Sequence, residues 1–182
     1  MRQESMAKYI LRLALTLLLI TAAVAAALAG INSITAPKIL ANKEAKIQEA
    51  IQTVLPGGGQ ETKFTDASGM VTAVWASDSG YAVQVAPAGF GGAITMMVGI
   101  DKDGKILGVS VVSQTETAGL GAVIGADTAA GQAFRDQFTG LSGELAVDKD
   151  GGQIDSVTGA TITSRAVTKG INAALDCVAN MG

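Results

Sequence analysis

Histidine is absent from this 182-residue chain and cysteine occurs only once, so several kinds of redox and metal site are excluded. Without histidine there is no Ser-His-Asp triad, no histidine-ligated zinc and no haem held by histidine. One cysteine cannot form a disulfide within the chain, a CxxC pair or the ligand set of an iron–sulfur cluster. Any redox chemistry must therefore come from a bound organic cofactor or from a partner protein.

Aromatic residues are also scarce, at 4% of the chain, and the net charge is −3. A chain with this composition is poorly suited to nucleic-acid binding. The charge is unevenly placed: residues 1–12 are mainly basic, residues 13–31 carry no charge, and residues 32–182 are acidic overall. The sequence therefore predicts a basic tip, an apolar helix and an acidic body.

The uncharged run, residues 13–31, has a length suited to crossing a membrane. Its 19 residues would extend about 28 Å as a helix, close to the hydrocarbon thickness of a bilayer. Basic residues adjoin only its N-terminal end, which predicts a cytoplasmic tip (residues 1–12) and an extracytoplasmic body on a single-pass cell-membrane protein. A cleaved signal peptide is the alternative, because residues 27–29 form a small-x-small pattern before a glycine.

Helical spacing continues after the apolar run. Leu40, Ile47, Ile51 and Val54 recur at gaps of seven, four and three residues, which predicts an amphipathic linker helix within residues 32–60. Pro37 is expected to start this helix. The body, residues 61–182, then follows as one domain.

The first half of the body has the composition of strands separated by turns. The predicted strands are residues 70–77, 81–86, 94–100 and 106–112. Turn-forming residues 101–105 link the last two strands as a hairpin, so we predict an antiparallel meander. The alternation within two of these strands places Ile94, Met96, Val98 and Ile100 on one face of the third, and Leu107, Val109 and Val111 on one face of the fourth.

Helical patterns predominate in the second half. They predict helices over residues 127–138 and 163–181, with a short strand at residues 154–157 between them. Strands followed by helices indicate an α+β domain rather than alternating βαβ units. Trp75, Tyr81 and Cys177 are predicted to be core residues, and no metal site is predicted.

The segment of residues 155–165 contains the residues most informative about function. Glycine allows close backbone approach to a ligand, and serine and threonine hydroxyls can accept hydrogen bonds from the first N–H groups of a helix. A helix N-terminus also favours a phosphate group. These residues alone are compatible with a phosphate site or with an ordinary helix N-cap.

The same segment matches a known motif for covalent flavin attachment. Asp155, Thr158, Gly159, Ala160 and Thr161 match every specified position of Asp-x-x-(Ser/Thr)-Gly-Ala-Thr. Proteins with this motif carry FMN as a phosphoester on the final threonine.

Further stretches resemble the G subunit of the Rnf electron-transport complexes, in the same order along essentially the whole chain. They are the basic tip with its apolar helix, residues 89–92, residues 97–101 and residues 116–121. The chain departs from the family pattern at Ala118, where the family usually has proline. The related C subunit of the sodium-pumping NADH:quinone reductase shares the FMN motif but is usually longer.

The resemblance implies that Thr161 carries FMN through its hydroxyl. A threonine hydroxyl needs an activating base, and this chain has no histidine for that role. In the family that the chain resembles, a separate flavin transferase with FAD as donor would supply the activation. Asp155 would be a recognition or positioning element for that transferase or an anchor at the helix N-terminus, with a turn-forming aspartate as the alternative. The implied cofactor contacts are Glu116, Thr117, Leu120, Gly121, Thr158, Gly159, Ala160, Ile162 and Thr163.

By this resemblance the chain is an electron-carrier subunit with no complete reaction of its own. It would relay electrons in a complex that couples ferredoxin and NAD oxidoreduction to Na⁺ or H⁺ transport, with other membrane and peripheral subunits as partners. Two other classes of function remain open: a membrane-anchored sensory domain with a non-covalent small ligand, and a secreted structural or adhesion module.

Overall fold

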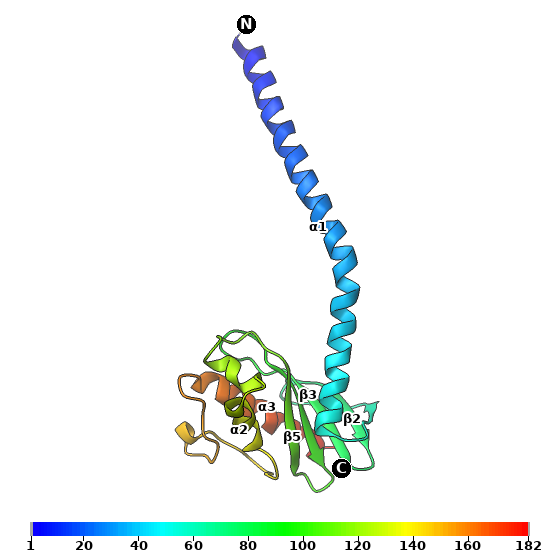
Figure 1. Cartoon of the computed structure of the whole chain (residues 1–182), viewed down its shortest axis with the longest axis vertical. Coiled ribbons are helices and arrows are strands. Elements are labelled where there is room, and N and C mark those ends of the chain that lie inside the picture. The colour runs from blue at the N-terminus through cyan, green and yellow to red at the C-terminus, as the bar shows by residue number, and fades with distance from the viewer. Residues whose placement is uncertain (1, 182) are drawn as a thin grey trace. The chain divides into compact units, whose positions relative to one another are not determined.

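The computed structural model describes residues 2–181, with side chains from residue 6 onward, and divides into two compact units (Figure 1). The first unit is Met1–Ala45 and the second is Lys46–Gly182. Helix α1 (Arg2–Val54) makes up the first unit, and its last turns belong to the second.

Helix α1 contains the only candidate membrane span among the described residues. Its segment Met6–Val54 includes an 18-residue window with a mean hydropathy of 2.4, none of it buried. Large apolar side chains such as Leu11 and Leu28 are more than 60% exposed, so this part of the helix is not the core of the domain.

The prediction that a second helix starts at Pro37 is wrong, because Pro37 lies inside the uninterrupted helix α1. Proline removes one backbone hydrogen bond from a helix. The helix nevertheless continues through this position, and the residues that follow it, 38–50, are mainly good helix formers.

One antiparallel sheet holds the five strands of the described chain in sequence order. The strands are β1 (Gln60–Thr62), β2 (Val71–Ser77), β3 (Gly80–Val85), β4 (Thr95–Asp101) and β5 (Ile106–Ser113). The predicted four-strand meander is confirmed. Strand β1 was not predicted, because three largely polar residues give no alternating pattern.

The side chains of strand β5 that face the core are not all those that the alternation predicted. Ile106 and Gly108 pair with consecutive residues of β4, so Leu107 between them is the extra residue of a β-bulge. Leu107 is consequently 41% exposed, whereas Ile106 and Val109 are buried. Only Val109 and the partly buried Val111 contact the core as the alternation predicted.

Two helices follow the sheet, α2 (Ala129–Asp136) and α3 (Thr161–Ala179), with short 3₁₀ turns η1 (Gly121–Gly125) and η2 (Asp148–Asp150). Helix α3 begins two residues earlier than predicted, so Thr161 is its first residue. The strand predicted at residues 154–157 is absent, and Ile154 makes only an isolated bridge with Val147.

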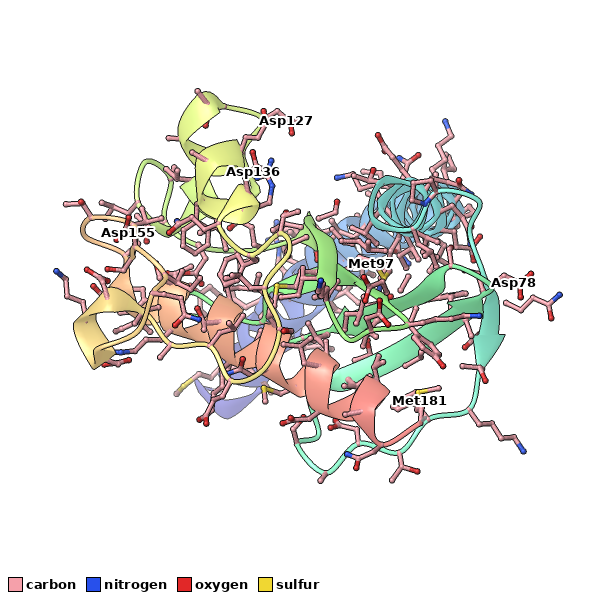
Figure 2. All side chains as sticks on the ribbon, turned by 90° about the horizontal axis from the view of Figure 1, so that it is seen from below. Asp78, Met97, Asp127, Asp136, Asp155 and Met181 are labelled. Carbon is pink, nitrogen blue, oxygen red and sulfur yellow. The ribbon has the colours of Figure 1, made fainter. Side chains whose placement is uncertain are left out.

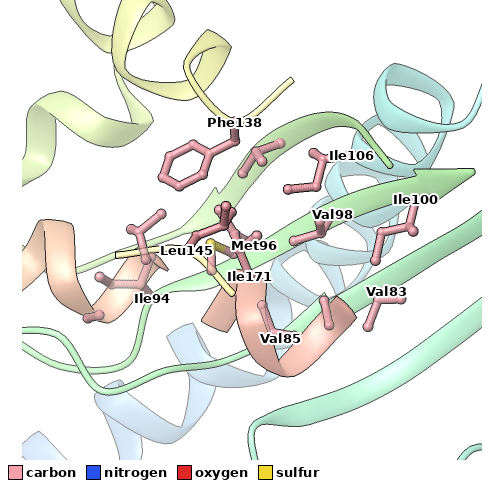
Figure 3. Close-up of a cluster of buried hydrophobic side chains, with 14 of the residues drawn as sticks. Val83, Val85, Ile94, Met96, Val98, Ile100, Ile106, Phe138, Leu145 and Ile171 are labelled. Carbon is pink, nitrogen blue, oxygen red and sulfur yellow. The ribbon is translucent and has the colours of Figure 1, made fainter. Parts of the chain in front are cut away.

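The sheet is packed on both faces. Four residues of the segment around β4 share the inward face as predicted: Ile94, Met96, Val98 and Ile100. They form the main core with Ile171 of α3 and with Phe138 (Figure 3). On the other face, Ile51, Val54 and Leu55 pack against Met97. Cys177 is buried in the main core as predicted, and the partly buried Tyr81 and Trp75 pack against the two cores.

Candidate functional site

Three segments that are far apart in the sequence surround a pocket of about 400 Å³. They are the glycine-rich loop 89–92, the loop 115–121 and the start of α3. The pocket is lined by Phe90, Glu116, Thr117, Leu120, Gly121, Gly159, Ala160, Thr161, Ile162 and Thr163. The structure therefore brings together Thr161 and all the predicted cofactor contacts except Thr158.

Glu116 joins the three segments. Its side chain is only 8% exposed, and its Oε1 accepts a hydrogen bond of 2.8 Å from the backbone N–H of Gly91. Its Oε2 accepts a hydrogen bond from the hydroxyl of Thr163 in α3. Because hydrogen bonds to a carboxylate are among the strong ones in proteins, Glu116 fixes the relative positions of the pocket walls.

Glycine is required where the loops approach this carboxylate. A Cβ atom at Gly121 would lie 2.6 Å from both Glu116 Oε2 and Thr163 Oγ1, and one at Gly89 would lie 2.5 Å from Glu116 Oε1. Neither position has room for a side chain. The glycines of these two loops thus allow the buried carboxylate to sit between them.

The N-terminus of α3 has unpaired backbone donors at the pocket. The N-cap position is Ala160, which provides no side-chain acceptor. Within the described residues, the N–H groups of Thr161, Ile162 and Thr163 have no hydrogen-bond partner. An anionic group is favoured at such a helix end by these donors and by the helix dipole.

The ordinary N-cap considered above is not what the structure shows. The hydroxyl of Thr163 is engaged by Glu116. The hydroxyl of Ser164 accepts from Val157 N–H at 3.0 Å and donates to the carbonyl of Ala160 at 3.1 Å. The threonine- and serine-rich segment therefore leaves the first N–H groups of α3 uncapped by side chains.

Thr161 is half-buried at this helix end, and its side chain makes no hydrogen bond within residues 2–181. Gly159 precedes it with a φ of +75°, a backbone conformation that favours glycine. This turn brings Gly159 against Leu120, since a Cβ atom there would lie 3.1 Å from the Leu120 side chain. The hydroxyl of Thr161 is thereby left free beside the uncapped N–H groups.

Asp155 and Thr158 lie outside the pocket and are exposed to solvent. Figure 2 shows Asp155 on the loop that leads into α3. Its carboxylate makes no hydrogen bond in the described part of the chain, so it does not form the turn considered as an alternative. Its backbone N–H and carbonyl instead bond to the side chain of Gln137, at 2.7 and 3.3 Å.

Phe90 is a pocket residue that the sequence analysis did not select. It is 70% exposed and stands with Leu120 and Ile162, which are 44% and 53% exposed, around the pocket. The only sequence signal was a phenylalanine flanked by glycines in a chain with four phenylalanines, and the structure adds its exposure, which is typical of a binding residue. The pocket thus combines an apolar rim with backbone donors.

Comparison with known proteins gives the class of this domain. The family model of the FMN-binding domain matches residues 89–176, which include the loops and the helix that form the pocket. The pocket residues fit FMN: uncapped N–H groups suit its phosphate, apolar side chains suit its ring, and the volume lies in the range of small-molecule sites. The chain therefore contains an FMN-binding domain at residues 89–176.

Its relatives are more specific. It is 37% identical to the G subunit of the proton-translocating ferredoxin:NAD⁺ oxidoreductase complex of Clostridium ljungdahlii, over 83% of this chain and 82% of the relative. It is 34% identical to the G subunit of the Na⁺-translocating complex of Acetobacterium woodii, over 96% and 94% of the two chains. The chain belongs to the family of G subunits of Rnf-type ion-translocating oxidoreductase complexes, which confirms the resemblance.

A further relative and a solved structure are also similar to this chain. The G subunit of an ion-translocating oxidoreductase complex of Methanosarcina acetivorans is 31% identical, over 94% of this chain and 95% of the relative. A crystal structure of the C subunit of the Na⁺-translocating NADH-quinone reductase of Parabacteroides distasonis overlaps with a TM-score of 0.44 and 28% identity, covering 58% of each chain.

Proposed function

We propose that this chain is the membrane-anchored electron-transfer subunit of an Rnf-type ferredoxin:NAD⁺ oxidoreductase complex, with FMN joined through a phosphoester to Thr161. The observation that carries this proposal is the position of Thr161. It is the first residue of α3, it lines the pocket, and its hydroxyl stands beside uncapped N–H groups. A phosphate bonded to that hydroxyl would meet the end of the helix that favours an anion.

The attachment reaction balances with FAD as the donor. The Thr161 oxygen would form a bond to the phosphorus on the FMN side of FAD, the pyrophosphate bond would break, and AMP would leave. The hydroxyl proton needs a base. Glu116, the only carboxylate among the described residues that line the pocket, already accepts hydrogen bonds on both oxygens. The base is therefore assigned to a flavin transferase.

The chain's own residues would hold and orient the cofactor. The uncapped N–H groups of α3 would bind the phosphate, and the apolar side chains of Phe90, Leu120 and Ile162 would pack against the ring system. Thr117, which lines the pocket, is placed to bond a polar edge of the ring. FMN, when bound, supplies the capacity to accept and release electrons.

Covalent attachment suits the proposed location outside the cell membrane. A non-covalent flavin would dissociate wherever its free concentration is low, whereas a phosphoester keeps it in place. Helix α1 would anchor the domain beside the other subunits of the complex, and its small residues between Ala22 and Gly30 permit close helix packing.

Flavin fluorescence after denaturation tests this proposal. Wild-type chain produced with its transferase should fluoresce in a denaturing gel, because a phosphoester survives unfolding. Thr161→Ala should fold but lose the fluorescence. Thr139→Ala, at an exposed threonine outside the pocket, should keep it. A fluorescent Thr161→Ala band would refute the assignment of the linkage.

A further inference from the structure

Gln137 links helix α2 to the segment that precedes Thr161. It is the C-cap residue of α2 and directly precedes Phe138, which is fully buried in the main core. Its side-chain Oε1 accepts the backbone N–H of Asp155 at 2.7 Å, and its Nε2 donates to the carbonyl of Asp155 at 3.3 Å. One side-chain amide therefore satisfies both backbone polar groups of Asp155.

The carboxylate of Asp155 is left free. It is exposed and makes no hydrogen bond within residues 2–181. The backbone next to it is fixed from another direction as well, because the N–H of Ser156 donates to Asp148 Oδ1 at 3.0 Å. Farther along, Arg165 of α3 makes a two-point ion pair with Asp150 of η2. A loop with a freely exposed carboxylate is thus restrained at its backbone.

From this geometry we infer that Gln137 is a positioning residue for flavin attachment: it fixes the backbone of Asp155 so that the flavin transferase meets the carboxylate in one orientation. This inference rests on the proposed covalent attachment at Thr161 and on recognition of the Asp155 carboxylate by the transferase, as the resemblance implies. A partner that recognises a carboxylate on a mobile loop must order the loop on binding, which weakens the complex. By restraining the loop in advance, Gln137 removes that cost.

Loss of Gln137 should weaken recognition of the chain without altering the reacting hydroxyl. Gln137→Ala should therefore raise the KM of the transferase for this chain about 5- to 10-fold, with kcat for flavin incorporation little changed. Gln137→Glu retains an acceptor for the Asp155 N–H but loses the donor to its carbonyl, so its KM should fall between those of wild type and Gln137→Ala.

The test uses the full chain in detergent, the purified transferase and FAD, with incorporation followed by intact mass at a series of chain concentrations. Gln132→Ala, at an exposed glutamine on the same helix, is the matched control and should behave as wild type. Thermal unfolding of each variant shows whether it is folded. If Gln137→Ala does not fold, the test uses Gln137→Glu instead, whose KM should be higher than that of wild type.

The outcomes separate the two proposals. A wild-type chain that incorporates flavin, together with a folded Gln137→Ala variant whose KM is unchanged, would overturn the role of Gln137 alone. A lowered kcat with an unchanged KM would also overturn it. A wild-type chain that incorporates no flavin would overturn the covalent attachment, and the role of Gln137 with it.

Discussion

Glu116 is buried although glutamate is usually exposed, and its surroundings explain why this burial is tolerated. A buried carboxylate is costly unless it is hydrogen-bonded. Here Gly91 and Thr163 each donate to one of its oxygens, and two glycines leave the space that it occupies. This single side chain connects the loop at residues 89–92 to the helix that begins at Thr161.

Removing this carboxylate should destabilise the domain. Glu116→Ala leaves the Gly91 N–H and the Thr163 hydroxyl without an acceptor, so the free energy of unfolding should fall by about 1–3 kcal/mol. Denaturant unfolding of the full chain in detergent measures the change. Glu144→Ala, at an exposed glutamate, provides the control and should change little. Equal stability of the two variants would contradict the joining role of Glu116.

Asp148 gives a prediction about pH. Hydrogen bonds from Ser156, and then from Lys149, lower the pKa of this carboxyl from 3.8 to about 2. Because its pKa is lower in the folded chain, the carboxylate stabilises the fold above about pH 4, and this contribution is lost as the pH falls to about 2.

The wild type should therefore be more stable than Asp148→Asn at pH 5, and the difference should shrink towards zero near pH 2. Urea unfolding at several pH values measures it. A difference that stays constant across this range would show that Asp148 does not titrate as the structure indicates.

Much of the pocket was predicted by the resemblance to the flavin-attachment motif and to the G-subunit stretches, whereas residue types alone left a phosphate site and an ordinary helix N-cap both open. Most of the chosen residues do line one pocket. The role of Glu116 was only partly anticipated, since its partners Gly91 and Thr163 come from distant segments that no local pattern connects. Phe90 was missed because an aromatic residue is usually assigned to the core unless its exposure is known.

At the scale of elements, composition and turn signals identified the four longer strands and the helices. The register of β5 could not be predicted, because the bulge at Leu107 depends on pairing with β4 rather than on local sequence. Likewise, the helical period around Ile51 and Val54 predicted an apolar face but not its partner. The structure shows that this face covers the second side of the sheet.

The end of α1 should therefore contribute to the stability of the domain. Ile51 is 2% exposed, and Ile51→Ala would leave a cavity against the sheet, lowering the free energy of unfolding by about 2–4 kcal/mol. Gln52→Ala, at the exposed neighbouring position, should have a much smaller effect. If the two variants unfold at the same denaturant concentration, the packing of α1 on the sheet is not part of the stable domain.

At the scale of the whole molecule, the charge pattern sets the expected orientation. Basic residues precede the apolar segment of α1, and the domain that follows is acidic, so the N-terminus is expected in the cytoplasm and the domain outside. A reporter active only outside the membrane should be active when fused after residue 182 and inactive when fused before residue 1. The reverse pattern would overturn the proposed topology.

The central claim is the bond between FMN and Thr161, and mass spectrometry of the native protein tests it most directly. Tryptic digestion should release residues 150–165 as one peptide. This peptide should be heavier than its amino acids by about 440 Da, and fragmentation should place the added mass on Thr161. An unmodified peptide, or added mass on another hydroxyl such as that of Thr158, would contradict the claim.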